Sequence, residues 1–90
     1  MARILLTGGS SFTGVWIAEA LAQAGFEVVA PLLRPREAYD GVRLDRVARL
    51  EKAAVVTYGR AFGSQLLLDD IRAAKPDVLI HHAAHITGYR

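Results

Sequence analysis

Short apolar runs alternate along this chain with segments patterned as helices, and the first junction between the two is rich in glycine. The run at residues 3–7 has the pattern of a strand buried on both faces, and it leads into the stretch TGGSSFTG at residues 7–14. Over residues 12–24, apolar and small residues recur every three or four positions, which predicts a helix ended by Gly25. The chain therefore opens with a strand, a tight turn and a helix.

The same order of elements continues along the rest of the sequence. Further strands are predicted at residues 26–33, 53–58 and 77–84. Regular pairing of the second strand is expected to end near Ala30, because Pro31 has no N–H to donate. A charged helix follows the loop at residues 34–41, and Ser64 is the expected N-cap of a third helix, which Pro76 ends. The order β-α-β-α-β-α-β predicts an α/β fold with a doubly wound parallel sheet.

Such sheets bind ligands outside the carboxyl ends of their strands. Function is therefore expected in the segments that follow the strands, at positions 7–14, 31–36, 58–63 and 82–88. In the first of these, Gly8 can supply a turn with positive φ, and Gly14 can allow close packing of the helix on the strand. The helix N-terminus would then point at a diphosphate. A helix cap that binds no ligand is the alternative.

Composition narrows the class of protein. Ninety residues suffice for one small domain, and 52% hydrophobic and 22% charged residues are ordinary for a soluble globular chain. The absence of cysteine excludes disulfides and thiolate chemistry and suits a reducing cytoplasm. The apolar runs are far shorter than the roughly 20 residues that span a bilayer. The net charge of +2 arises between Arg34 and Lys52, where interleaved acids indicate a solvated helix face rather than a nucleic-acid surface.

Two motifs resemble those of a known family. Thr7-Gly8 followed by Gly14 resembles the TGxxGxxG fingerprint of the extended short-chain dehydrogenase/reductases, the NAD(P)-dependent epimerases and dehydratases of nucleotide-activated sugars. DVLIHHAA, residues 77–84, is similar to DxVIHLAA at the end of that family's fourth strand. The resemblance implies a Rossmann-type sheet, of which residues 1–90 form the N-terminal part, and a cytoplasmic enzyme of about 300 residues whose remainder lies outside this chain.

The resemblance also implies which residues bind the dinucleotide. Gly8, Phe12 and Thr13 would line the pyrophosphate, mainly through backbone N–H groups. His82, Ala83 and Ala84 would lie along the cofactor, the two alanines being small enough to let it approach closely. Together with the positions discussed next, the implied cofactor-binding set is Gly8, Ser11, Phe12, Thr13, Gly14, Arg34, Arg36, Arg60, His82, Ala83 and Ala84.

Three positions depart from the family pattern. Ser11 replaces the middle glycine, so its side chain either donates to a phosphate or crowds the dinucleotide. Position 32, where family members that prefer NAD usually carry an acid at the end of the second strand, is Leu, and Arg34 and Arg36 follow. Guanidinium groups suit a 2′-phosphate, which favours NADP over NAD unless both arginines point into water. Arg60 stands where the family has an aspartate that meets adenine, and it can stack on the base or meet a phosphate but cannot accept the amino protons.

Catalysis in the family depends on a Tyr with a Lys four residues later. None of Tyr39, Tyr58 and Tyr89 has such a lysine, so no catalytic residue is assigned in this chain. His81 and His82 should point to opposite faces of a strand, so no metal site is expected.

The sequence thus indicates the NAD(P)-binding portion of a nucleotide-sugar epimerase or dehydratase, an isomerase that uses oxidoreductase chemistry. The full enzyme would be a homodimer with no nucleic-acid or membrane partner. The alternatives are a non-catalytic dinucleotide-binding or sensor module, and a reductase of small carbonyls.

Overall fold

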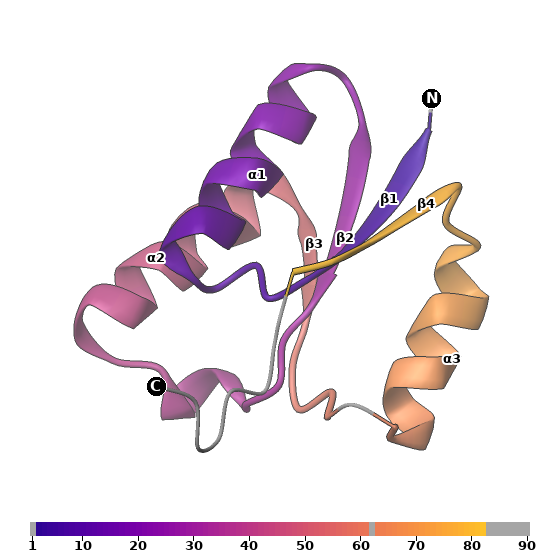
Figure 1. Ribbon diagram of the computed structural model, residues 1–90. Helices are drawn as coiled ribbons and strands as arrows, with labels where there is room; N and C mark the ends of the chain where they lie inside the picture. Colours follow the sequence, from indigo (N-terminus) through magenta and orange to yellow (C-terminus); the bar gives the residue numbers. More distant parts are fainter. Residues whose placement is uncertain (1, 62, 83–90) are drawn as a thin grey trace, which may run out of the picture.

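Four parallel strands form a single sheet in the order β3-β2-β1-β4 (Figure 1). The computed structural model describes residues 2–61 and 63–82. The strands are β1 (Arg3–Thr7), β2 (Glu27–Pro31), β3 (Val55–Thr57) and β4 (Val78–His81). The chain moves outward from β1 to β3 and then crosses to the other side of β1, where β4 pairs. The predicted doubly wound parallel sheet is confirmed.

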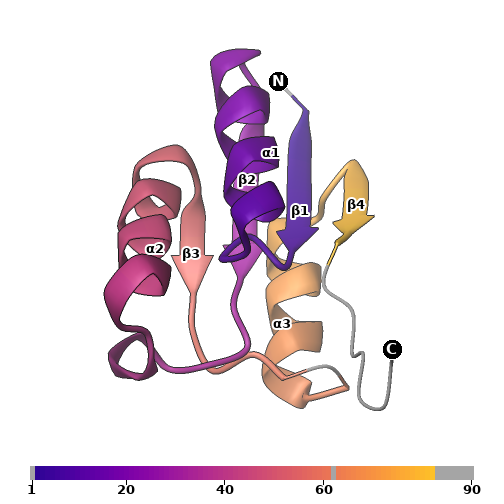
Figure 2. The same cartoon turned by 60° about the vertical axis from the view of Figure 1, so that its left-hand side comes forward.

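The helices lie on both faces of this sheet. They are α1 (Phe12–Gln23), α2 (Gly41–Ala53) and α3 (Gln65–Ala74), with a short 3-10 helix, η1 (Arg36–Ala38), between β2 and α2. Figure 2 shows α1 and α2 on one face and α3 on the other. The change of face accompanies the reversal in the order of the strands, which run outward from β1 to β3 and then continue on the other side of β1, so the topological switch point lies between β1 and β4. None of the described helices has the length and apolar character needed to cross a bilayer.

Local sequence explains where the helices begin and end. The Ser64 hydroxyl accepts a hydrogen bond from the backbone N–H of Leu67 at 3.2 Å, which confirms the predicted N-cap of α3. This helix ends at Lys75, whose φ of 47° is left-handed, and Pro76 follows. At the end of α1, Gly25 has a φ of +93°, so the predicted glycine stop is also confirmed.

Regular pairing of the second strand extends one residue beyond Ala30, where the sequence predicts that it ends, although β2 is shorter than the predicted strand at residues 26–33. Pro31 pairs in register with Thr57, and the backbone N–H of Leu32 donates to the Thr57 carbonyl at 2.8 Å. Successive N–H groups of a strand point to opposite sides, so the donor that Pro31 lacks would face β1, whose pairing with β2 has already ended at Val29. The proline therefore costs the sheet no hydrogen bond.

The main core fills the space between the sheet and the two helices α1 and α2. Its members come from β1, β2, both helices and the loop between β2 and α2, and they are Leu6, Val15, Ala18, Val28, Ala30, Leu32, Tyr39, Val47 and Leu50. Burial of this many apolar side chains fixes the first helix and that loop against the sheet. Both segments border the carboxyl ends of the strands, where the candidate site lies.

Candidate functional site

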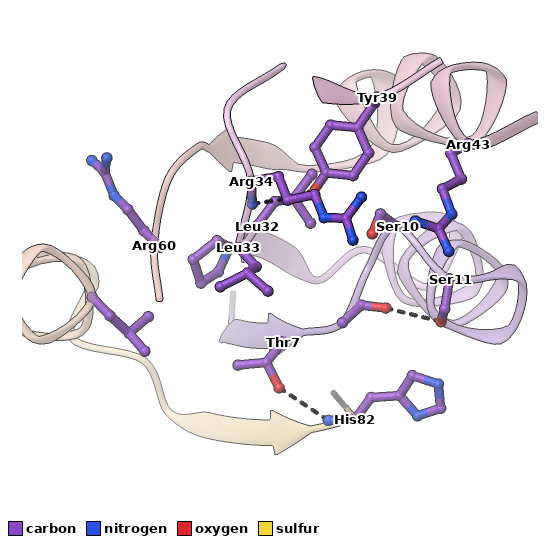
Figure 3. Close-up of a pocket in the computed structure, with 13 residues that line it drawn as sticks. Thr7, Ser10, Ser11, Leu32, Leu33, Arg34, Tyr39, Arg43, Arg60 and His82 are labelled. Atoms are coloured by element: carbon purple, nitrogen blue, oxygen red, sulfur yellow. Dashed lines mark hydrogen bonds between the residues drawn. The ribbon is translucent and has the colours of Figure 1, made fainter. Parts of the chain in front are cut away.

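A cavity of about 660 Å³ opens at the carboxyl ends of the strands (Figure 3). This volume is within the range of small-molecule and cofactor sites. Each of the four segments expected to carry function contributes residues, and α2, α3 and the loop before α2 add others. The lining residues are Thr7, Gly8, Ser10, Ser11, Pro31, Leu32, Leu33, Arg34, Tyr39, Arg43, Arg60, Leu67 and His82.

The glycine-rich turn after β1 is closed by Ser11. Gly8 has a φ of 75°, as predicted for a tight turn. The Ser11 hydroxyl donates to the Gly8 carbonyl at 3.0 Å and accepts from the Gly14 N–H at 3.0 Å, so Ser11 is the N-cap of α1. The sequence raised two roles for this side chain, donation to a phosphate or crowding of the ligand. In the structure its hydroxyl is instead used within the turn.

Gly14 packs directly on the turn. A Cβ atom at this position would lie 2.0 Å from the Gly8 carbonyl oxygen and 2.9 Å from the Gly9 Cα. These are backbone atoms, which no rotamer change can move away. The helix packs closely at this glycine, but against the turn after β1 rather than against the strand itself, and only glycine fits.

Two α2 residues hold the turn from the other side. Arg46 donates from Nε to the Ser10 carbonyl at 3.0 Å, and the Leu50 methyl carbons lie within 3.2 Å of where a Cβ on Gly9 would stand. This support joins residues 36 positions apart in the sequence. No local pattern indicates it, so the sequence reasoning missed Arg46.

Phe12 and Thr13 form the first turn of α1 and do not line the cavity. The Phe12 side chain is 67% exposed. The first N–H groups of a helix have no intrahelical partner and point out of its N-terminus. Any contribution of these two residues to binding an anion therefore comes from the backbone, as the resemblance implied.

Solved structures with the same arrangement of elements are nucleotide-sugar enzymes and a reductase. UDP-glucose-4-epimerase (galE) from Stenotrophomonas maltophila, solved with bound NAD and formylated UDP-arabinopyranose, has a TM-score of 0.70 and 22% identity; the match covers 94% of this chain and 25% of the epimerase. dTDP-glucose 4,6-dehydratase (rfbB) from Bacillus anthracis str. Ames, in complex with NAD, has a TM-score of 0.73 and 19% identity, with 94% and 27% covered. Vestitone reductase from alfalfa (Medicago sativa L.) has a TM-score of 0.63 and 22% identity, with 97% and 26% covered.

The chain has a Rossmann fold. It spans about a quarter of the length of the solved chains that it matches. These neighbours agree with the resemblance to epimerases, dehydratases and reductases that the two sequence motifs carry. No protein-family model matches the chain, and no curated protein matches it.

Two arginines that line the cavity have side chains without a protein partner among the described residues. Arg34 follows β2 and Arg43 lies in the first turn of α2, and both are exposed. Within the described part of the chain, neither guanidinium group has a hydrogen bond or ion pair. Figure 3 shows both groups extending toward the side of the cavity formed by Ser10 and Ser11. The sequence did not indicate Arg43 as a site residue, because its position opposite Arg34 depends on the path of the irregular loop between β2 and α2.

That loop is well anchored. The backbone N–H of Arg34 donates to the Tyr39 hydroxyl at 3.3 Å, and its carbonyl accepts from the Gly59 N–H at 3.1 Å. Tyr39 is buried, with 6% of its surface exposed. Arg34 is therefore presented from a fixed stretch of backbone even though its side chain is free to move.

Arg36, the other predicted phosphate ligand, does not line the cavity. Its Nε and Nη2 atoms donate to the two Glu51 carboxylate oxygens at 2.9 and 3.2 Å, and the Tyr58 hydroxyl donates to the same carboxylate. Hydrogen bonds from Arg36 and then Tyr58 lower the pKa of Glu51. Placing Arg36 beside Arg34 at the ligand therefore needs correction, because Glu51 holds this side chain at the surface.

Arg60 also differs from the expectation. Its Nε donates to Asp70 on α3 at 2.8 Å and its Nη1 to the Tyr58 carbonyl at 2.6 Å, and Asp70 also accepts a hydrogen bond from the Thr57 hydroxyl. In Figure 3 the guanidinium group points away from Arg34 and the rest of the cavity. Arg60 borders the site, but its charge is paired, so stacking on adenine or contact with a phosphate has no support in this geometry.

A threonine links β1 to β4 at the switch point. Thr7 is 4% exposed, and its Oγ1 accepts a hydrogen bond from the His82 backbone N–H at 3.1 Å and lies 3.0 Å from Nδ1 of His81. The His82 side chain borders the cavity. Ala83 and Ala84 lie outside the described residues. Across residues 2–61 and 63–82, no three metal-ligating side chains are grouped as a metal site.

Proposed function

We propose that this chain is the N-terminal, NAD(P)-binding part of an extended short-chain dehydrogenase/reductase, an epimerase or dehydratase of nucleotide-activated sugars. The observation that carries the proposal is the position of the cavity. It lies at the switch point of a Rossmann sheet, beside a positive-φ glycine turn and the N-terminus of α1, which is where dinucleotides bind. The neighbours solved with NAD support the same site.

The described residues fit such a ligand. The turn at Gly8 and the first N–H groups of α1 would hold the diphosphate, and the apolar side chains of Leu32, Leu33 and Leu67 would cover the adenosine half. When bound, the nicotinamide ring supplies hydride transfer. Neither Tyr39 nor Tyr58 has a lysine four positions later, so we assign the described residues to binding and orientation of the cofactor.

We also propose that the site prefers NADP over NAD. Arg34 and Arg43 line it with free guanidinium groups, and no carboxylate is among its described lining residues. A dinucleotide with a 2′-phosphate gives these donors an anionic partner, and charge-assisted hydrogen bonds of this kind each contribute about 1.5–3 kcal/mol. NAD lacks that phosphate, and the cavity offers no acid to accept hydrogen bonds from its ribose hydroxyls.

Fluorescence titration with NADPH and NADH tests this assignment. NADPH should bind more tightly, and Arg43→Gln should weaken NADPH binding by about tenfold or more while changing NADH binding little. Arg36→Gln is the matched control, because it removes an arginine of the same segment that is paired with Glu51 outside the cavity. A larger loss from Arg36→Gln than from Arg43→Gln would contradict the proposed geometry. Binding of neither nucleotide would remove the proposal altogether.

The activity itself concerns a longer protein. This chain matches about a quarter of the length of the neighbours. We propose that the whole enzyme is a cytoplasmic homodimer that acts on a nucleotide-activated sugar as an epimerase or a dehydratase. Expression of the continuing reading frame, followed by mass spectrometry of UDP- and dTDP-hexoses after incubation, distinguishes an epimerase from a dehydratase by loss of water.

A further inference from the structure

His82 is a titratable side chain at a place where the resembled family has none. It stands in DVLIHHAA where DxVIHLAA has leucine, and its side chain lines the cavity. Its backbone is fixed, because its N–H donates to the buried Thr7 hydroxyl at 3.1 Å. Figure 3 shows the imidazole extending from the end of β4 toward the side of the cavity where Ser11 caps α1. Within the described residues the ring has no hydrogen-bond or ion-pair partner.

The charged groups around this imidazole are mainly positive. Arg43 lies on α2 and Arg34 lies in the segment after β2, and both have free guanidinium groups. The positive end of α1 faces the same cavity. Arg60, from the segment after β3, is paired with Asp70 of α3, and the neighbouring His81 contacts Thr7. A bound anion would therefore meet positive groups on several sides, and a protonated imidazole would add another.

We propose that His82 is a titratable ligand for the diphosphate of the bound dinucleotide, so that binding takes up a proton. This inference rests on the proposed function. The protonated ring carries two N–H donors and a positive charge, whereas the neutral ring keeps one donor and no charge. Affinity should therefore rise as pH falls through the range in which histidine titrates. A leucine at this position, as in the family motif, has no such dependence.

NADH is the better probe for this test. Its diphosphate oxygens remain ionised across the pH range, whereas the 2′-phosphate of NADPH changes charge near pH 6, as phosphate monoesters do, which would confuse the readout. NADH should bind severalfold more tightly at about pH 6 than at about pH 8, because only the protonated imidazole brings a positive charge and a second N–H donor to the diphosphate.

Two substitutions isolate the imidazole. His82→Leu should abolish the pH dependence, and His82→Gln, which keeps a neutral hydrogen-bond donor, should abolish it as well. His81→Asn is the matched control, because its amide oxygen can replace Nδ1 beside Thr7 and it leaves His82 in place. This control should keep the pH dependence of the unmodified chain. Circular dichroism establishes that each variant is folded.

The outcomes separate the two proposals. Dependence on pH that survives in both His82 variants, or that is lost in His81→Asn and kept in His82→Leu, overturns the role of His82 while nucleotide binding stands. Equal NADH affinity of the unmodified chain at both pH values overturns it too. Failure of the chain to bind NADH and NADPH at any pH instead refutes the dinucleotide site on which the inference rests.

Discussion

The contact between Gly14 and Gly8 gives the sharpest test of how the glycine turn is built. In Gly14→Ala the new Cβ would stand 2.0 Å from the Gly8 carbonyl oxygen, whereas ordinary contact begins near 3.4 Å. The helix and the turn must separate, which disturbs both hydrogen bonds of the Ser11 hydroxyl. Overpacking of this kind costs about 1–3 kcal/mol and a lost N-cap about 1 kcal/mol, while alanine regains about 1 kcal/mol of helix propensity. The expected net loss of stability is about 1–3 kcal/mol.

Gly9→Ala is a matched control for this substitution. It makes the same chemical change in the turn on which Gly14 packs, but its Cβ would meet the Leu50 methyl carbons at 3.1 and 3.2 Å, and these can shift by rotation of the side chain. We expect a loss of about 1 kcal/mol or less. Urea unfolding followed by circular dichroism measures both, since Trp16 is 66% exposed and is a poor fluorescence probe of the core. Equal losses in the two variants would refute the argument from backbone contact.

Three further predictions follow from contacts around the site. Ser11→Ala should lower stability by about 1 kcal/mol and weaken NADPH binding, as measured by urea unfolding and fluorescence titration. Arg46→Met keeps the apolar stem but loses the bond to the Ser10 carbonyl, so it should weaken NADPH binding with a stability loss of about 1 kcal/mol; unchanged affinity would show that the turn needs no support from α2. Burial and the bond to Glu51 raise the pKa of Tyr58 to about 12. The contribution of the Tyr58 hydroxyl to the free energy of unfolding should therefore be complete below about pH 10 and be lost as pH rises through about 12. In Tyr58→Phe this alkaline loss should be smaller in thermal unfolding.

The elements of the fold were predictable because each has a local signal. Apolar runs of strand length, the Ser64 cap and the glycines at positions 8, 14 and 25 all depend on neighbours within a few residues, and the structure confirms them. The ends of the strands were harder to predict. At Pro31, the missing N–H would face β1, whose pairing with β2 has already ended, so pairing with β3 continues, and the local sequence does not show this.

The partners of the arginines could not be predicted from the sequence. Arg36 binds Glu51, and Arg60 binds Asp70 on a different helix, while Arg43 remains free in the cavity. These three arginines have long charged side chains and lie in or beside irregular segments, where no periodicity fixes the direction of a side chain. The sequence therefore placed positive charge at the carboxyl ends of the strands correctly, but it could not tell which of these charges another part of the chain neutralises.

The hydrogen bond from His82 to Thr7 has a consequence for how the sheet opens. It joins residues 75 positions apart, and β4 is an edge strand on which Val78 and Leu79 are 49% and 55% exposed. A strand that pairs across so long a stretch of sequence, with so little apolar burial, is expected to open more readily than the rest of the sheet and to exchange its amide hydrogens faster. A dinucleotide held between the glycine turn and His82 would bridge β1 and β4 directly. Amide hydrogen exchange in β4 should then slow on binding far more than in β2, whose neighbours on both sides are already in place.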